Sequence, residues 1–232
     1  MKTLFPYKRQ KFNNELILEN LPDEILDILL RNQDQLKYKK GQLLYHEGAT
    51  PNGLFYIQKG RVKKFATGYD GKEHIYYICG ERELLGYHPM LCDETNPDSA
   101  ETLEPCELIF IPKGNFMMAL KTSPDFHSKL LQNLSHECGA FINATMILAQ
   151  YSVRERTALA LLIINEKYLS GGSLDATIDL SRDDLSNYVG TAKESLVRIL
   201  RDFKDEGFIS SSGRGIVIKD FDALIRISNF FG

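Results

Sequence analysis

Hydrophobic and polar positions alternate in short runs over the first half of the chain, with glycine- and proline-containing turn segments between the runs. The runs that are richest in aliphatic and aromatic residues are 41–48, 53–67, 73–80 and 106–112. Short runs of this kind are typical of β-strands, and many in succession favour a small antiparallel barrel or roll. Ahead of them, residues 20–32 predict one short helix with Pro22 in its first turn.

From residue 124 the spacing of the hydrophobic positions becomes helical. Five positions step by four and three residues: Leu134, Cys138, Phe141, Thr145 and Leu148. This spacing places them along one narrow seam, as in a two-stranded coiled coil. We therefore expect a long helix through which two copies of the chain associate. The alternative is a helix that lies on its own β-domain. A hinge is expected near Ser152, followed by a second helix.

The segment from residue 181 to 207 predicts two helices joined by a tight turn. Ser181 followed by Asp184 fits a capping box at the start of the first helix, and Gly190 ends that helix. Thr191 followed by Glu194 offers a second capping box, so a new helix is expected almost at once. Two helices with so short a connection are typical of a helix-turn-helix.

The second of these helices is amphipathic. Its predicted buried positions are Leu196, Ile199, Leu200 and Phe203, and its predicted exposed positions are Lys193, Glu194, Val197, Arg198 and Arg201. Gly207 stands where a left-handed C-terminal cap belongs. Residues 208–220 then alternate like a two-stranded ribbon with Arg214 near its tip. The pattern predicts a winged helix-turn-helix.

The exposed face of the second helix carries side chains that suit DNA. An arginine such as Arg198 can bridge O6 and N7 of a guanine, and Glu194 can accept from a cytosine amino group and orient Arg198 one turn away. Lys193 and Arg214 suit phosphate contacts. The alternative is a solvated Glu–Arg pair that stabilises the helix slightly. The predicted DNA-binding residues are Ser181, Thr191, Lys193, Glu194, Val197, Arg198, Arg201 and Arg214.

With these motifs the chain resembles the Crp/Fnr family of transcription regulators. The segment ESLVRIL, residues 194–200, is similar to the family's E-T/S-x-x-R recognition helix, in which the position of Val197 varies among subfamilies. Residues 39–63 resemble the family's cyclic-nucleotide-binding-like roll, with glycines at the turns. The resemblance implies an α+β fold and a homodimer that binds double-stranded DNA. RNA polymerase is expected as a further partner. The expected parts are a β-roll effector domain with an N-terminal helix (1–122), a dimerisation helix and hinge (123–152) and a winged helix-turn-helix (153–232).

The effector pocket implied by the resemblance departs from the cyclic-AMP-binding pattern. Members that bind cyclic AMP carry a Gly-Glu pair for the ribose and an Arg-Ser pair for the phosphate, whereas the matching places here read Gly86-Tyr87 and Asp98-Ser99. A buried carboxylate would repel the phosphate, so cyclic AMP is not expected to bind. The alternative for Asp98 is a solvated loop carboxylate. The predicted pocket residues are Gly86, Tyr87, Asp98, Ser99, Phe141 and Ile142.

The positions of the cysteines and histidines argue against an iron–sulfur cluster but do not identify a cofactor. The four cysteines are scattered and none precedes Cys79, whereas an iron–sulfur cluster of the Fnr type needs an N-terminal cysteine cluster. We interpret them as reduced thiols in a cytoplasmic protein. His74, Cys79 and His88 are the candidate ligands for a haem. The effector, if there is one, is left unknown.

Composition and motifs limit the other classes of function. The chain has 232 residues and a formal net charge of −3, so only a local basic face is expected to contact nucleic acid. No stretch approaches the roughly 18 apolar residues of a membrane span, and the common hydrolase and phosphate-binding motifs are absent from the sequence. We therefore expect no enzyme and no membrane partner. The alternative function is a sensor of a small molecule or haem whose winged helix docks a protein.

Overall fold

The computed structural model describes residues 17–30, 33–169 and 176–229. The chain divides into two compact units, one with residues 17–71 and 76–138 and the other with residues 72–75 and 139–229. The division falls inside one continuous helix, α4 (Pro124–Gln150). The domain limits expected at residues 122 and 152 remain predictions. Among the described residues, none of the helices combines the length and hydrophobicity that a membrane crossing requires.

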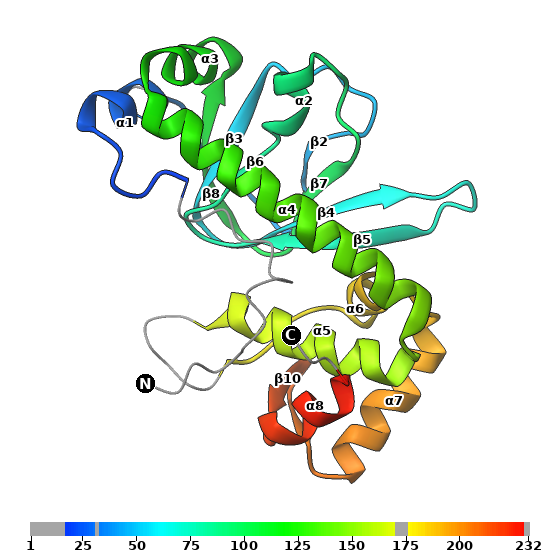
Figure 1. The fold of residues 1–232 in the computed structure, drawn as a ribbon. Helices are drawn as coiled ribbons and strands as arrows, with labels where there is room; N and C mark the ends of the chain where they lie inside the picture. The colour runs from blue at the N-terminus through cyan, green and yellow to red at the C-terminus, as the bar shows by residue number, and fades with distance from the viewer. Residues whose placement is uncertain (1–16, 31–32, 170–175, 230–232) are drawn as a thin grey trace. The chain divides into compact units, whose positions relative to one another are not determined.

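The first unit is built on two four-stranded sheets (Figure 1). One sheet has the order β1-β8-β3-β6, and its strands are β1 (Gln35–Tyr38), β8 (Cys106–Pro112), β3 (Gly53–Lys59) and β6 (Leu84–Leu85). The other has the order β2-β7-β4-β5, and its strands are β2 (Leu43–Tyr45), β7 (Ser99–Thr102), β4 (Val62–Thr67) and β5 (Glu73–Cys79). The pairs β1–β8, β3–β8, β3–β6, β2–β7 and β4–β7 are antiparallel. The predicted antiparallel roll is confirmed.

In the described part of the chain, four helices share one apolar core with strands β3, β6 and β8. They are α1 (Asp23–Leu30), α2 (His88–Cys92), α3 (Lys113–Thr122) and the first part of α4. Phe116 of α3 and Phe126 of α4 meet edge to face, with ring centroids 6.0 Å apart. Pro22 is the residue before α1 and does not stand in its first turn. Its carbonyl accepts from the backbone N–H groups of Ile25 and Leu26. Neither α2 nor α3 was predicted.

The second unit contains the last part of α4 and a bundle of short elements. These elements are α5 (Val153–Tyr168), α6 (Arg182–Val189), α7 (Lys193–Asp205), β9 (Ile209–Ser212), β10 (Gly215–Ile218) and α8 (Phe221–Ser228). Ser152 is the N-cap of α5 and forms a reciprocal capping box with Glu155. The helix therefore breaks where the sequence placed the hinge. Hinge motion itself remains a prediction.

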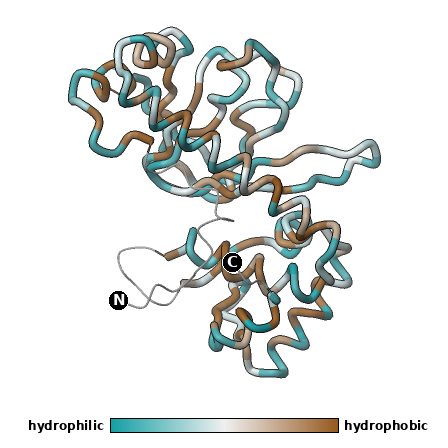
Figure 2. The backbone as a smooth tube through the Cα atoms, in the orientation of Figure 1, coloured by the Kyte–Doolittle hydropathy of each residue, from teal (hydrophilic) through white to brown (hydrophobic). Residues whose placement is uncertain are grey.

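Helix α7 is amphipathic in the predicted manner. Leu196, Ile199, Leu200 and Phe203 are buried. Along α7 the hydropathy colours change between hydrophobic and hydrophilic within each turn (Figure 2). Arg154 of α5 holds the end of this helix, because its guanidinium lies 4.7 Å from the ring centroid of Phe203 and donates two hydrogen bonds to Glu206. The polar face of α7 is thus fixed outward.

Gly60, in the turn between β3 and β4, tests how tightly the roll is packed. Its φ is +97°, and a Cβ there would lie 2.6 Å from Sγ of Cys106. Gly71 has a similar φ of +78° but open space around it. We expect Gly71→Ala to lower the free energy of unfolding by about 1–2 kcal/mol from backbone strain. Gly60→Ala should lower it by about 1–3 kcal/mol more, since overpacking is added. Equal losses in urea denaturation would contradict the close packing.

Candidate nucleic-acid interface and effector site

The turn between α6 and α7 depends on Gly190. Gly190 adopts a left-handed conformation, with φ 70° and ψ 51°, and its N–H donates to the carbonyl of Ser186. The N–H of Thr191 donates to the same carbonyl, over 3.1 Å. Such bonds satisfy helix-end carbonyls that have no partner within the helix. The chain therefore leaves α6 in a fixed direction and enters α7 within three residues.

The two predicted caps of this helix pair have different outcomes. Ser181 is the N-cap of α6, and its hydroxyl accepts from the backbone N–H of Asp184 over 2.9 Å. The predicted capping box of Thr191 with Glu194 is wrong, because the N-cap of α7 is Ala192, which has no side-chain acceptor. The physical reason is that Thr191 still belongs to the end of α6, where its N–H is used.

The predicted reading side chains lie on the open face of α7. Lys193, Glu194, Val197, Arg198 and Arg201 are all exposed. Glu194 and Arg198 stand one turn apart, at positions that face the same side of a helix. Lys193 is not a free cation, since its Nζ lies 2.8 Å from Oδ2 of Asp183 in the first turn of α6. A phosphate contact by Lys193 would have to compete with that exposed ion pair.

The wing is a two-stranded ribbon with a tight tip. Strands β9 and β10 are antiparallel, with Ser212 opposite Gly215, so Gly213 and Arg214 form the connection. The left-handed φ of Gly213, +59°, suits a two-residue hairpin. Ile178 forms an isolated antiparallel bridge with Ile216, at the edge of β10 that does not pair with β9. Arg214 is exposed at the tip.

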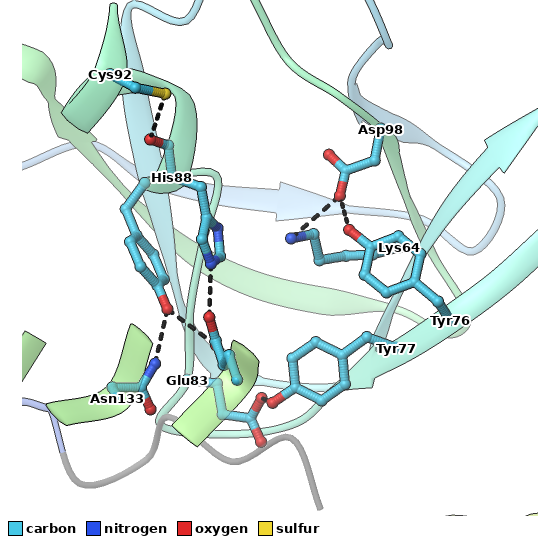
Figure 3. Close-up of polar contacts among 10 residues, drawn as sticks. Lys64, Tyr76, Tyr77, Glu83, His88, Cys92, Asp98 and Asn133 are labelled. Carbon is cyan, nitrogen blue, oxygen red and sulfur yellow. Dashed lines mark hydrogen bonds and ion pairs between the residues drawn. The ribbon is translucent and has the colours of Figure 1, made fainter. Parts of the chain in front are cut away.

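The interior of the roll contains a buried ion pair (Figure 3). Nζ of Lys64, on β4, lies 3.1 Å from Oδ2 of Asp98, and the Tyr76 hydroxyl also donates to Asp98. Lys64 is 5% exposed and Asp98 is 3% exposed, so Asp98 is not the solvated loop carboxylate of the alternative interpretation. Burial by itself lowers the pKa of Lys64, but Tyr45 and Asp98 raise it by more, and the net shift is upward. Lys64 therefore stays charged and offsets the charge of Asp98.

The other predicted pocket residues differ in burial and in hydrogen bonding. Gly86 has a φ of +89°, and the Ser99 hydroxyl accepts from the backbone N–H of Glu47 over 3.0 Å. Tyr87 is completely buried. Phe141 and Ile142 lie on α4 in the second unit, are exposed, and remain predicted pocket residues only.

A second polar network joins α2 to α4 in the same unit (Figure 3). The Tyr87 hydroxyl donates to Oε1 of Glu137 over 3.0 Å and accepts from Nδ2 of Asn133 over 2.8 Å. Nε2 of His88 lies 2.6 Å from Oε2 of Glu137. Burial opposes the ionisation of Glu137, but the hydrogen bond and charge of His88 outweigh it and hold the pKa of Glu137 below its usual value. Tyr87 and His88 are thus bound to α4.

Sequence reasoning missed Lys64, Glu137 and Tyr45 as parts of the roll interior. The hydroxyl of Tyr45 is buried and has no hydrogen-bond partner within the described residues. One signal was available for Lys64. Two consecutive lysines stand inside a strand, and because successive side chains point to opposite faces, one of them must face inward.

The three candidate haem ligands have different surroundings: His74 lies in the second unit, and its Nδ1 is 3.0 Å from the carbonyl oxygen of Asn187. Cys79 is completely buried, and His88 is already held by Glu137. Across residues 17–30, 33–169 and 176–229, no group of three or more His, Cys, Asp and Glu side chains could hold a metal ion. Cys79 and Cys106 are buried, whereas Cys92 and Cys138 are exposed.

Comparison with known families accounts for both units. The cyclic nucleotide-binding domain family matches residues 35–123, and the Crp-like helix-turn-helix domain family matches residues 155–227. The chain belongs to the Crp/Fnr family of transcription regulators. A Crp/Fnr regulator binds DNA through its helix-turn-helix, which gives the exposed face of α7 its context.

Individual relatives agree with this membership. The chain is 23% identical over 212 residues to a CRP-like cAMP-activated global transcriptional regulator of Mycobacterium tuberculosis, covering 90% of this chain and 95% of the relative. It is 27% identical over 184 residues to the transcriptional activator protein anr of Pseudomonas aeruginosa, covering 78% of this chain and 75% of the relative. These names give no support to a winged helix that docks a protein.

Solved structures share the fold. The c-di-GMP responsive global regulator CLP of Xanthomonas campestris has a TM-score of 0.71 and 20% sequence identity to this chain, and the match covers 86% of this chain and all of that one. The arrangement of roll, long helix and helix-turn-helix is therefore the one expected from the sequence.

The charge balance of Lys64 and Asp98 can be tested by removing one partner and then both. We expect Lys64→Met to lower the free energy of unfolding by about 3–5 kcal/mol, because it leaves a buried carboxylate unpaired. The double variant Lys64→Met/Asp98→Asn should regain most of this loss in chemical denaturation, since no charge is left buried. Lys37→Met is the matched control: Lys37 pairs with Glu107 at 3.9 Å but is 82% exposed, and its loss should cost less than about 1 kcal/mol. No recovery in the double variant would show that charge is not the cause.

Proposed function

We propose that this Crp/Fnr regulator is a homodimer that reads a pseudo-palindromic DNA site through α7. The observation that carries the proposal is the placement of Glu194 and Arg198, one turn apart, on the exposed face of a helix whose other face is packed. Arg198 reads a guanine, Glu194 reads a cytosine amino group, and Arg214 on the wing holds phosphate. The half-sites lie one helical turn apart, roughly 34 Å.

The exposed side of α4 supports the dimer. Cys138, Phe141, Thr145 and Leu148 of the predicted seam are exposed along this one helix. Ile142 next to them is 66% exposed. Apolar side chains on an open helix stripe lose contact with water when two such helices pair. The proposed protein partner is RNA polymerase, on which a transcription regulator acts. The proposed location is the cytoplasm.

The reading roles can be tested by selecting binding sequences from random duplex DNA. We expect the wild-type protein to enrich a palindrome. Arg198→Ala should lose the preference at one base pair of each half-site, at a cost of about 1–3 kcal/mol. Arg214→Ala is the matched comparison and should weaken binding to all sequences about equally, because a phosphate contact carries no base information. Unchanged selectivity of Arg198→Ala would remove Arg198 from the reading role, and failure of the wild type to enrich any site would contradict the proposed function.

We further infer that cyclic AMP is not the effector. Asp98 stands at the phosphate place and is already neutralised by Lys64, while the Tyr87 hydroxyl at the ribose place is used by Glu137 and Asn133. The names of the relatives point to different effectors, cAMP in one and c-di-GMP in another. Family membership therefore leaves the effector open.

Thermal unfolding with added cyclic AMP tests this inference. A ligand that binds the folded protein at 100 times its Kd adds about 2.7 kcal/mol to the stability. We expect millimolar cyclic AMP to leave the unfolding temperature of this protein unchanged. A concentration-dependent rise would show that the nucleotide displaces the internal contacts of Asp98 and Tyr87.

A further inference from the structure

One arginine near the start of α5 binds four backbone carbonyls. Nε of Arg156 donates to Val189 over 3.1 Å, and Nη2 donates to Gly190 over 3.1 Å. Nη1 donates to Tyr151 over 3.0 Å and to Leu148 over 3.4 Å. All of these residues belong to the second unit. The side chain therefore makes four hydrogen bonds to acceptors from two different parts of that unit.

The four carbonyls come from the ends of two helices. Leu148 and Tyr151 are in the last turn of α4 and the residues after it, and Val189 and Gly190 close α6. Carbonyls at a helix end lack partners within the helix and carry the negative end of its dipole. A guanidinium offers five N–H donors in one plane together with a fixed positive charge. Arg156 thus ties the end of the dimerisation helix to the turn that leads into α7.

The joint around Arg156 is closely packed as well as hydrogen-bonded. A Cβ at Gly190 would lie 3.1 Å from Cδ2 of Leu148, so the turn and the last part of α4 already touch. On the other side, the Tyr151 hydroxyl donates to the carbonyl of Asn229 over 3.4 Å, and the Asn229 amide donates to Glu155 over 3.3 Å. The break between α4 and α5 at Ser152 is therefore stabilised by contacts from the end of α6 and from the end of α8.

We propose that Arg156 is the positioning residue that sets the spacing between the two DNA half-sites. The inference rests on the proposed function, in which two subunits pair along α4 and each reads one half-site with α7. In such a dimer the joint at the end of α4 decides where each α7 stands. Without the hydrogen bonds of Arg156, each α7 still reads its own half-site, but the distance between the two α7 helices takes more than one value. Arg156 acts through the α6–α7 turn and does not read bases.

The test compares selected binding sites of the full-length wild type, Arg156→Lys and Arg226→Lys. Lysine keeps the charge but replaces the planar fork by a compact ammonium that cannot span the four carbonyls. We expect the wild type to select one spacer length. Arg156→Lys should select the same half-site sequence with several spacer lengths, and its affinity for the wild-type spacing should fall about tenfold.

Arg226→Lys is the matched control, because Arg226 is an exposed arginine in the last turn of α8 in the same unit. Its variant should keep a single spacer. Arg156→Gln, tested in parallel, should broaden the spacing as Arg156→Lys does, so the test does not depend on one variant. Thermal unfolding shows which variants are folded.

The outcomes separate the two levels of the proposal. A single spacer at wild-type affinity in folded Arg156→Lys would overturn the positioning role alone. Loss of the half-site sequence itself in a folded Arg156 variant would also overturn it, because Arg156 would then affect reading rather than spacing. Failure of the wild type to enrich any sequence would overturn the proposed function, and the role of Arg156 with it.

Discussion

Burial of one face of α7 is the constraint on which the reading surface depends. Leu196 and Phe203 are completely buried, so the helix cannot rotate without exposing them. Rotation is further opposed by Arg154, which binds Phe203 and Glu206 at the far end. The exposed positions of α7 are therefore fixed by its hydrophobic ones. In the proposed role, the exposed surface of α7 owes its orientation to the packing of the opposite face.

The roll follows a different principle, because its interior is partly polar. Lys64 and Asp98 cancel each other's charge, and Glu137 is satisfied by Tyr87 and His88. Buried charges are tolerated only when they are paired and hydrogen-bonded. Any effector that enters here must offer polar groups that replace these contacts. In this chain the polar groups inside the roll are bound to one another, and the fold alone does not name a ligand.

The sequence predicted the elements whose signals are periodic or local. The buried positions of α7, the cap at Ser181 and the break at Ser152 were all readable from spacing and residue type. The pairing of Lys64 with Asp98 was not, because it joins β4 to the residue before β7 and depends on which face of β4 points inward. The cap at Thr191 was misread because the end of α6 and the start of α7 compete for the same residue, and backbone bonding decides. Helix α2 is only five residues long and leaves no periodic pattern.

The hydrogen bonds of Arg156 restrict some positions of the sequence more than others. Its four acceptors are backbone carbonyls, which every residue type supplies in the same form. Leu148, Tyr151 and Val189 can therefore vary among related proteins without removing an acceptor, whereas position 156 cannot change without losing every donor at once. Gly190 is restricted for a separate reason, its left-handed backbone. The joint between α4 and the turn into α7 is thus recorded in the sequence by one arginine and one glycine, although five residues build it.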